Sequence, residues 1–134
     1  MDESLLEIRE YKGEGYQSLI HFGDWRVAIL RWEKALQPEQ INAMERHTQT
    51  DEVFVLLEGQ ATLILGGKDG VVEGVYPQVM ENDKLYNVKQ DVWHTVVLSR
   101  DASILIVEDR DTGKENTEFC ILSEKQKQEI IALG

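Results

Sequence analysis

Short apolar runs recur along most of the chain, separated by segments rich in glycine, aspartate and asparagine. Runs of this length, with turn residues between them and no helical periodicity, are typical of β-strands. The pattern predicts strands over residues 5–11, 16–22, 25–32, 53–58, 61–65, 71–76, 84–88, 94–98 and 103–108. Many short strands without intervening helices favour an all-β sandwich or barrel.

Three segments depart from this pattern. In residues 63–72 the sequence LILGGKDGVV predicts a hairpin, because glycine permits positive φ at its tip. At the end of the chain Ser123 and Gln126 have the spacing of a capping box. Together with apolar residues at helical spacing, this box predicts a C-terminal helix at about residues 123–133. Residues 38–44, PEQINAM, fit either a short helical turn or a loop.

Two of the predicted strands, residues 61–65 and 103–108, carry apolar side chains on both faces. A solvated outer face would alternate with polar residues more regularly. Something should therefore cover the outside of one sheet, and a second copy of the chain is the simplest candidate. We therefore expect a homodimer.

The chain has 134 residues, which fits one domain over residues 1–134 with its own core. Apolar residues make up 42% and charged residues 29%, as in an ordinary globular protein. The formal net charge of −11 repels phosphate groups, so neither nucleic acid nor an anionic membrane is expected as a partner.

A cytoplasmic location is expected by default, because neither a secretory signal nor a membrane-spanning run is recognisable in the sequence. The first residues, MDESLLEIRE, lack the basic and apolar segments of a secretory signal. The longest apolar runs fall far short of the roughly 20 residues that span a bilayer. Cys120 is the single cysteine, so an internal disulfide is impossible, and we expect it to be a small buried residue on a late strand.

Potential metal ligands are concentrated just before the predicted strand over residues 53–58. Glu45, His47 and Glu52 lie within AMERHTQTDEVFVLLEG, residues 43–59, and His94 begins another strand. Residues two apart on a strand share a face, so Glu52 should point inward with Phe54, as should His94 with the apolar residues after it. Polar residues at the open end of an apolar barrel would form a ligand pocket.

These two segments resemble the motifs of the cupin family, a family of metal-binding jelly-roll barrels. His47, four residues, Glu52, six residues and Gly59 match the latter part of the first motif, G-x5-H-x-H-x3–4-E-x6-G. The position of that motif's first histidine holds Glu45. The resemblance covers residues 40 to 110 and implies an antiparallel jelly-roll barrel.

The second motif, G-x5-P-x-G-x2-H-x3-N, is less complete in this chain. His94 is retained, whereas Asp83 takes the first glycine position, Lys89 the proline and Asp91 the second glycine.

The resemblance implies a divalent metal held by His47, Glu52 and His94, with Glu45 as a further ligand or as a general base. Two histidines and a carboxylate form a mixed nitrogen and oxygen site that suits Fe, Mn, Ni or Zn. Taken separately, each histidine could instead be an ordinary hydrogen-bonded residue.

Other residues are weaker candidates for ligand contacts. Gln49 and Thr50 adjoin the metal-like residues and could orient a substrate, or could be ordinary loop residues. Phe54 and Tyr86 could line a pocket wall or simply fill the core. Arg31 could hold a ligand carboxylate or phosphate, although an exposed or salt-bridged arginine is the commoner case.

Three functions are compatible with these features. The first is an enzyme with a divalent metal that converts a small polar metabolite, such as a sugar or organic acid, by isomerase, dioxygenase or lyase chemistry. The second is a protein that binds a small molecule without turnover. The third is a dimeric structural cupin whose metal site is degraded, which the replacement at Glu45 favours.

Overall fold

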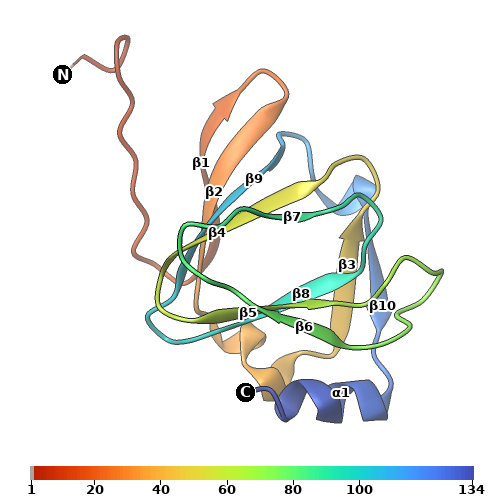
Figure 1. Ribbon diagram of the computed structural model, residues 1–134. Helices are drawn as coiled ribbons and strands as arrows, with labels where there is room; N and C mark the ends of the chain where they lie inside the picture. The colour runs from red at the N-terminus through yellow and green to blue at the C-terminus, as the bar shows by residue number, and fades with distance from the viewer. Residues whose placement is uncertain (1) are drawn as a thin grey trace.

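The computed structural model describes residues 2–134, which form two antiparallel five-stranded sheets packed face to face (Figure 1). The first sheet has the strand order β1-β2-β9-β4-β7, and the second has the order β10-β3-β8-β5-β6. The strands are β1 (Gly15–Phe22), β2 (Trp25–Arg31), β3 (Ala43–His47), β4 (Glu52–Glu58), β5 (Ala61–Leu65), β6 (Tyr76–Val79), β7 (Tyr86–Val88), β8 (His94–Leu98), β9 (Ser103–Asp109) and β10 (Thr117–Ile121). Three 3-10 helices (Lys34–Leu36, Pro38–Gln40 and Lys114–Asn116) and the helix α1 (Glu124–Ile131) complete the described chain. The predicted jelly-roll arrangement is confirmed.

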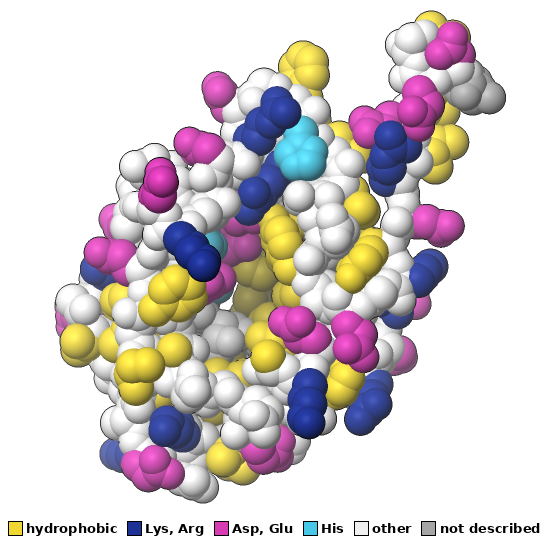
Figure 2. Space-filling model, turned by 180° about the vertical axis from the view of Figure 1, so that it is seen from behind, with side chains coloured by type: hydrophobic (Ala, Val, Ile, Leu, Met, Phe, Trp, Pro, Cys, Tyr) yellow, Lys and Arg dark blue, Asp and Glu magenta, His cyan; other side chains and the backbone are white. Residues whose placement is uncertain are grey.

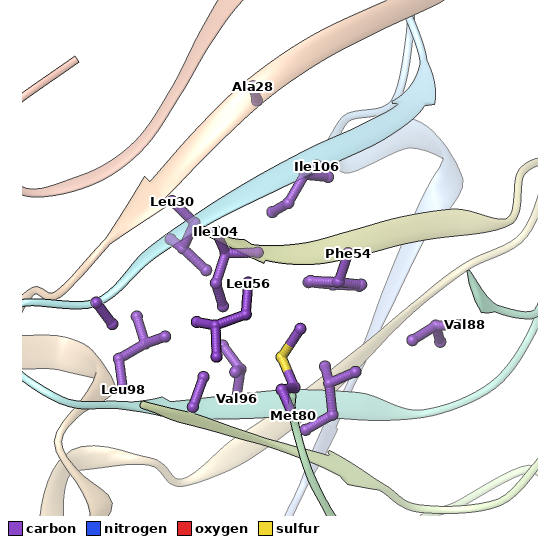
Figure 3. Close-up of a cluster of buried hydrophobic side chains, with 13 residues drawn as sticks. Ala28, Leu30, Phe54, Leu56, Met80, Val88, Val96, Leu98, Ile104 and Ile106 are labelled. Atoms are coloured by element: carbon purple, nitrogen blue, oxygen red, sulfur yellow. The ribbon is translucent and has the colours of Figure 1, made fainter. Parts of the chain in front are cut away.

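The core lies between the two sheets and is built from alternate residues of the central strands (Figure 3). On β4, Phe54 and Leu56 are buried on the same face as Glu52. On β8, Val96 follows His94 into the same interior. Burying a large apolar side chain contributes about 1.5–3 kcal/mol. The strands that carry the candidate ligands are therefore held by apolar residues on the same face.

The C-terminal helix begins as predicted. Ser123 accepts a hydrogen bond from the backbone N–H of Gln126, and the Gln126 side chain accepts one from the backbone N–H of Ser123. This reciprocal pair satisfies two of the free donors at the start of the helix. None of the helices in residues 2–134 has the length and hydrophobicity of a membrane span.

Two strand predictions are wrong, and two strands were not predicted. Residues 5–11 pair with no sheet and extend away from the body of the molecule with Leu5 and Ile8 exposed (Figure 1). Residues 71–76 belong mainly to the connection between β5 and β6, and only Tyr76 lies in a strand. β3 and β10 were missed because polar and charged residues occupy much of both strands, in AMERH and TEFCI.

The outer face of the second sheet is covered by the chain itself. Ile64 on β5 points away from the barrel and packs with Met44, Trp93, Leu122 and Ile130 in a second apolar cluster. Ile130 comes from α1, so the helix provides the cover that the apolar outer face requires. A second copy of the chain is not needed at this position, which corrects that part of the expectation.

The first sheet has a different outer face. Val27, Ile29, Val53, Leu105 and Val107 lie on it and are partly exposed. The register places Val27 beside Val107 and Ile29 beside Leu105, so these side chains form one continuous apolar surface. A homodimer through this face stays a prediction.

Replacing Ile130 with alanine tests how far α1 stabilises the barrel. Ile130 is fully buried, so we expect Ile130→Ala to lower the free energy of unfolding by about 2–5 kcal/mol. Leu133→Ala, at a residue that is 40% exposed beyond the same helix, should cost less than about 1 kcal/mol. Urea unfolding of both variants measures the difference. Equal small losses would mean that the helix does not stabilise the sheet beneath it.

Candidate functional site

A pocket of about 610 Å³ opens between the two sheets. Its inner wall is apolar, and charged side chains and histidines gather at one end. The apolar lining includes Leu30, Met44, Phe54, Val96 and Ile106. Figure 2 shows a hollow in the middle of one face of the molecule, with hydrophobic side chains at its walls and acidic side chains beside it. The combination of an apolar wall with a few polar groups at one end is typical of small-molecule sites.

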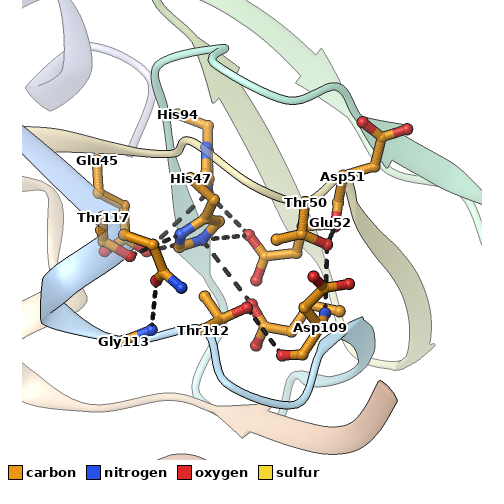
Figure 4. A network of polar contacts seen from close by, with 12 residues as sticks. Glu45, His47, Thr50, Asp51, Glu52, His94, Asp109, Thr112, Gly113 and Thr117 are labelled. Carbon is orange, nitrogen blue, oxygen red and sulfur yellow. Dashed lines mark hydrogen bonds and ion pairs between the residues drawn. The ribbon is translucent and has the colours of Figure 1, made fainter. Parts of the chain in front are cut away.

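The polar end is built around Glu52, whose side chain is 6% exposed (Figure 4). Its Oε1 lies 3.0 Å from Nε2 of His47 and 3.0 Å from Nε2 of His94. The contact with His47 is a hydrogen bond. The contact with His94 lacks hydrogen-bond geometry, and His94 Nε2 is a buried atom with no hydrogen-bond partner within residues 2–134.

The other ring nitrogen of each histidine is held by a neighbour. His94 Nδ1 donates to the backbone carbonyl of Val92, 3.0 Å away, so the lone pair of a neutral His94 is on Nε2. His47 Nδ1 lies 2.9 Å from Oγ1 of Thr117, its register partner on β10. Both rings are thus fixed with Nε2 directed toward Glu52, as second-sphere contacts fix metal-binding histidines.

Asp51 connects the two loops that carry these ligands. Its carboxylate accepts hydrogen bonds from the side chain of Asn87 and from the backbone N–H of Gln90. These two hydrogen bonds lower the pKa of Asp51. The loop before His94 is thereby tied to the loop between His47 and Glu52.

Glu45 lies on β3 directly opposite His94 on β8. Its Oε1 is 3.8 Å from Nε2 of His47 and 3.9 Å from Nε2 of His94. Its side chain is 40% exposed, in contrast to the buried Glu52. The structure thus brings together all four residues that the sequence placed at the metal site.

Glu108, Tyr16 and Arg26 also belong to this end of the pocket, and the sequence analysis missed them. The Glu108 side chain is 2% exposed, and its Oε2 accepts hydrogen bonds from Tyr16 (2.6 Å) and from Arg26 (3.2 Å). Its Oε1 is 3.9 Å from Nε2 of His47. The strand pattern did indicate the direction of Glu108, because this residue lies two positions after Ile106 on a predicted strand and so had to face inward.

The structure places one of the five predicted ligand-contact residues at the wall of the pocket. Phe54 lines the pocket, with its ring centroid 6.0 Å from that of His94. Gln49, Thr50, Tyr86 and Arg31 are not among its lining residues. Arg31 belongs to the outer face of β2, and Arg26, five positions earlier, is the arginine that reaches the pocket.

The hydroxyls of Thr50 and Tyr86 form hydrogen bonds elsewhere in the structure. Thr50 Oγ1 donates to the backbone carbonyl of Asp51 and accepts from the N–H of Asp109, and the Tyr86 hydroxyl accepts from the N–H of Glu81.

The electrostatics of the cluster are dominated by Glu52. Burial raises its pKa, but the contacts with His47 and His94 outweigh burial and hold the pKa at about 2. Burial lowers the pKa of His94, but the carboxylate of Glu52 outweighs it and raises the pKa to about 8. Burial and the charge of Glu52 raise the pKa of Glu108. The cluster thus favours positive charge beside Glu52.

Comparison with known proteins relates this fold to solved structures. Ureidoglycolate lyase from Agrobacterium fabrum (strain C58 / ATCC 33970) is 28% identical over 116 residues, which are 84% of this chain and 66% of that protein. The chain therefore spans just under two thirds of the length of this relative. A cupin-2 domain containing protein from Shewanella frigidimarina NCIMB 400 matches with a TM-score of 0.52 at 17% identity, over 81% of this chain and 89% of that chain. The protein has a cupin fold.

Another structural match is a 3,4-ketoisomerase from Helicobacter canadensis, with a TM-score of 0.55 at 11% identity. It covers 81% of this chain and 73% of the ketoisomerase chain. No protein-family model matches the sequence.

The backbone has left-handed bends at two positions where the sequence departs from the cupin motif. Asp83 and Asp91, which replace the two glycines of the second motif, both have φ of 69°. This left-handed conformation favours glycine, and aspartate is one of the few other residues that adopt it routinely. Gly59 has φ of 75°, and a Cβ there would lie 2.7 Å from Cα of Ala102, so this glycine is required.

The side chains present fit the divalent metal that the cupin motif implies. Glu45, His47 and His94 offer ligand atoms within 4.8 Å of one another, and so do His47, Glu52 and Glu108. The buried His94 Nε2 without a hydrogen-bond partner is the atom that a metal would satisfy. Imidazole nitrogens with carboxylate oxygens suit Fe, Mn, Ni or Zn.

The stability of the metal-free protein should depend on pH. The pKa of His94 rises from 6.5 in the unfolded chain to about 8 in the fold, so its stabilising contribution is complete below pH 6.5 and is lost as pH rises through 8. Urea unfolding in chelator should therefore give a lower free energy of unfolding at pH 9 than at pH 6. His94→Gln should flatten this dependence, and His21→Gln, at an exposed histidine, should not. An equally steep dependence in His94→Gln would contradict the prediction.

Proposed function

We propose that this protein binds a divalent metal ion, one of Fe, Mn, Ni or Zn, through His47, Glu52 and His94, and that it binds and converts a small polar metabolite in the adjoining pocket. The observation that carries the proposal is the buried His94 Nε2, which faces Glu52 and has no hydrogen-bond partner within residues 2–134. A buried polar atom without hydrogen-bond geometry needs an explanation, and a metal ligand in its metal-free form is a common one.

The charges around the pocket support the presence of a cation. Glu52 and Glu108 are both buried, and Glu45 lies at the same end. Within residues 2–134, Arg26 is the one lysine or arginine that forms an ion pair with a member of this group, and it does so with Glu108. Taking a carboxylate out of water is expensive unless a positive charge compensates it. A divalent ion would balance the remaining negative charge.

A metal bound there would supply Lewis-acid chemistry, polarising a carbonyl or hydroxyl oxygen of the ligand. The protein supplies the other groups. Thr117 and Val92 hold the two imidazoles in place, and Phe54 and its apolar neighbours limit access of water to one side of the ligand. Glu45 is partly exposed beside the ligand set, where its carboxylate can take a proton from a bound ligand and return it.

The ligand class follows from the size and lining of the pocket. A volume of about 610 Å³ is in the range of sites for small molecules. The polar groups lie at one end, so a ligand that presents hydroxyl, carbonyl or carboxylate oxygens there would be oriented by the metal. One relative is named a lyase and one structural neighbour a ketoisomerase, which favours lyase or isomerase chemistry on a sugar or organic acid.

The metal content of the purified protein tests the metal site. We expect about one divalent ion per chain in protein prepared without tag or chelator, as for a single site of this ligand set. His47→Ala and His94→Ala should each lose the metal and remain folded, whereas His21→Ala, at an exposed histidine, should retain it. Elemental analysis and circular dichroism provide the measurements.

The same analysis separates the alternatives. Absence of metal in the parent protein, even after reconstitution with Fe, Mn, Ni and Zn, would refute the metal site and favour a cupin whose metal site is degraded. Bound metal without turnover of any sugar or organic acid would favour a binding protein.

Replacing Glu45 with glutamine tests its role in proton transfer. We expect Glu45→Gln to lower turnover by roughly 10²–10⁴-fold, as loss of a general base does. Metal content should be unchanged, because the other three residues remain. Glu118→Gln, at an exposed residue on β10, serves as the control. Turnover of Glu45→Gln at the parent rate would exclude Glu45 as the base.

A further inference from the structure

We infer that Glu108, on β9, is the fourth protein ligand of the metal site, in place of the histidine that the first cupin motif lacks here, and that Glu45 remains outside the ligand set. This inference rests on the metal site proposed above. It predicts a site of two histidines and two buried carboxylates, drawn from four strands of both sheets.

The position of Glu108 is suited to this role. β9 is paired on both sides, with β2 and β4, and Glu108 lies opposite Arg26 in the register. Its Oε1 is 3.9 Å from Nε2 of His47. Ligand atoms of His47, Glu52 and Glu108 all lie within 4.8 Å of one another. A single ion placed among them can contact all three.

The two oxygens of Glu108 have different surroundings. Oε2 accepts both hydrogen bonds, from the hydroxyl of Tyr16 and from the guanidinium of Arg26. Oε1 faces His47 and forms no hydrogen bond within residues 2–134. A carboxylate held through one oxygen and free at the other resembles the arrangement in which outer hydrogen bonds orient a metal ligand. Tyr16 and Arg26 are therefore positioning residues for Glu108.

Burial distinguishes Glu108 from Glu45. The Glu108 side chain is 2% exposed, whereas that of Glu45 is 40% exposed. Water compensates the charge of Glu45 at little cost. Within the protein, by contrast, Arg26 meets only one oxygen of Glu108, and the two histidines meet Glu52. Both of these buried carboxylates are close to His47, so a cation there would lie between them.

A purely structural role for Glu108 is the competing explanation. Arg26 also donates to the backbone carbonyls of Arg110 and Thr112, so Glu108 could serve only to hold Arg26 against that loop. In that case, loss of its charge would change the stability of the fold and leave the affinity for metal unaltered.

The test is calorimetric titration of the metal-free full-length protein with Mn²⁺ and with Co²⁺. We expect Glu108→Gln to weaken binding of both ions by at least tenfold, and Glu45→Gln to weaken it by less than about threefold. Tyr16→Phe, which removes one of the hydrogen bonds that orient Glu108, should weaken binding by an intermediate factor. The visible absorption of bound Co²⁺ should change in Glu108→Gln and should match that of the parent in Glu45→Gln.

Each outcome has a defined consequence. If the parent binds neither ion, the proposed metal site fails and this inference fails with it. If the parent binds and Glu45→Gln is the variant with reduced affinity and altered Co²⁺ spectrum, the inference alone is overturned. Circular dichroism shows whether Glu108→Gln folds. If it does not, the metal affinities of Tyr16→Phe and Glu108→Asp test the inference, because both variants retain the carboxylate and shift its position. Parent affinity in both of these variants would overturn the inference.

Discussion

Glu52 places a largely buried carboxylate between the imidazoles of His47 and His94, and several surrounding contacts hold the two imidazoles against it. An isolated carboxylate at that depth would be very costly to bury. Both imidazoles are therefore held from behind, by Thr117 on β10 and by the carbonyl of Val92, with Nε2 directed at the carboxylate. The apolar core beneath Glu52 excludes water, and the same exclusion strengthens each charge interaction above it.

The cluster also explains why two different sheets must pack closely at this end. β3 and β8 of the second sheet supply the histidines and Glu45, and β4 and β9 of the first sheet supply Glu52 and Glu108. Neither sheet contains all five of these residues by itself. The site exists only when the core between the sheets has formed, which links the chemistry of the pocket to the stability of the barrel.

Strand periodicity accounts for what could be predicted from the sequence and for what was missed. Glu52 and His94 begin strands whose next alternate residues are apolar, so their inward direction followed from the pattern. Glu108 ends such a strand and was overlooked because it adjoins a charged loop. Arg31 was predicted as a ligand contact and Arg26 was not, although the buried Ala28 and Leu30 lie on the same face of β2 as Arg26. The cover over Ile64 was not predictable, because it depends on where α1 docks after the barrel closes.

The turns at Asp83 and Asp91 relate the backbone of this chain to the second cupin motif. Compared letter by letter with the motif, the chain lacks glycine at both of these positions. The backbone makes both bends with the same sign of φ, at the modest strain that aspartate tolerates there. A bend that glycine usually permits is thus made here by aspartate. Distant relatives of this protein are accordingly better sought by which residues each bend allows than by identity to glycine.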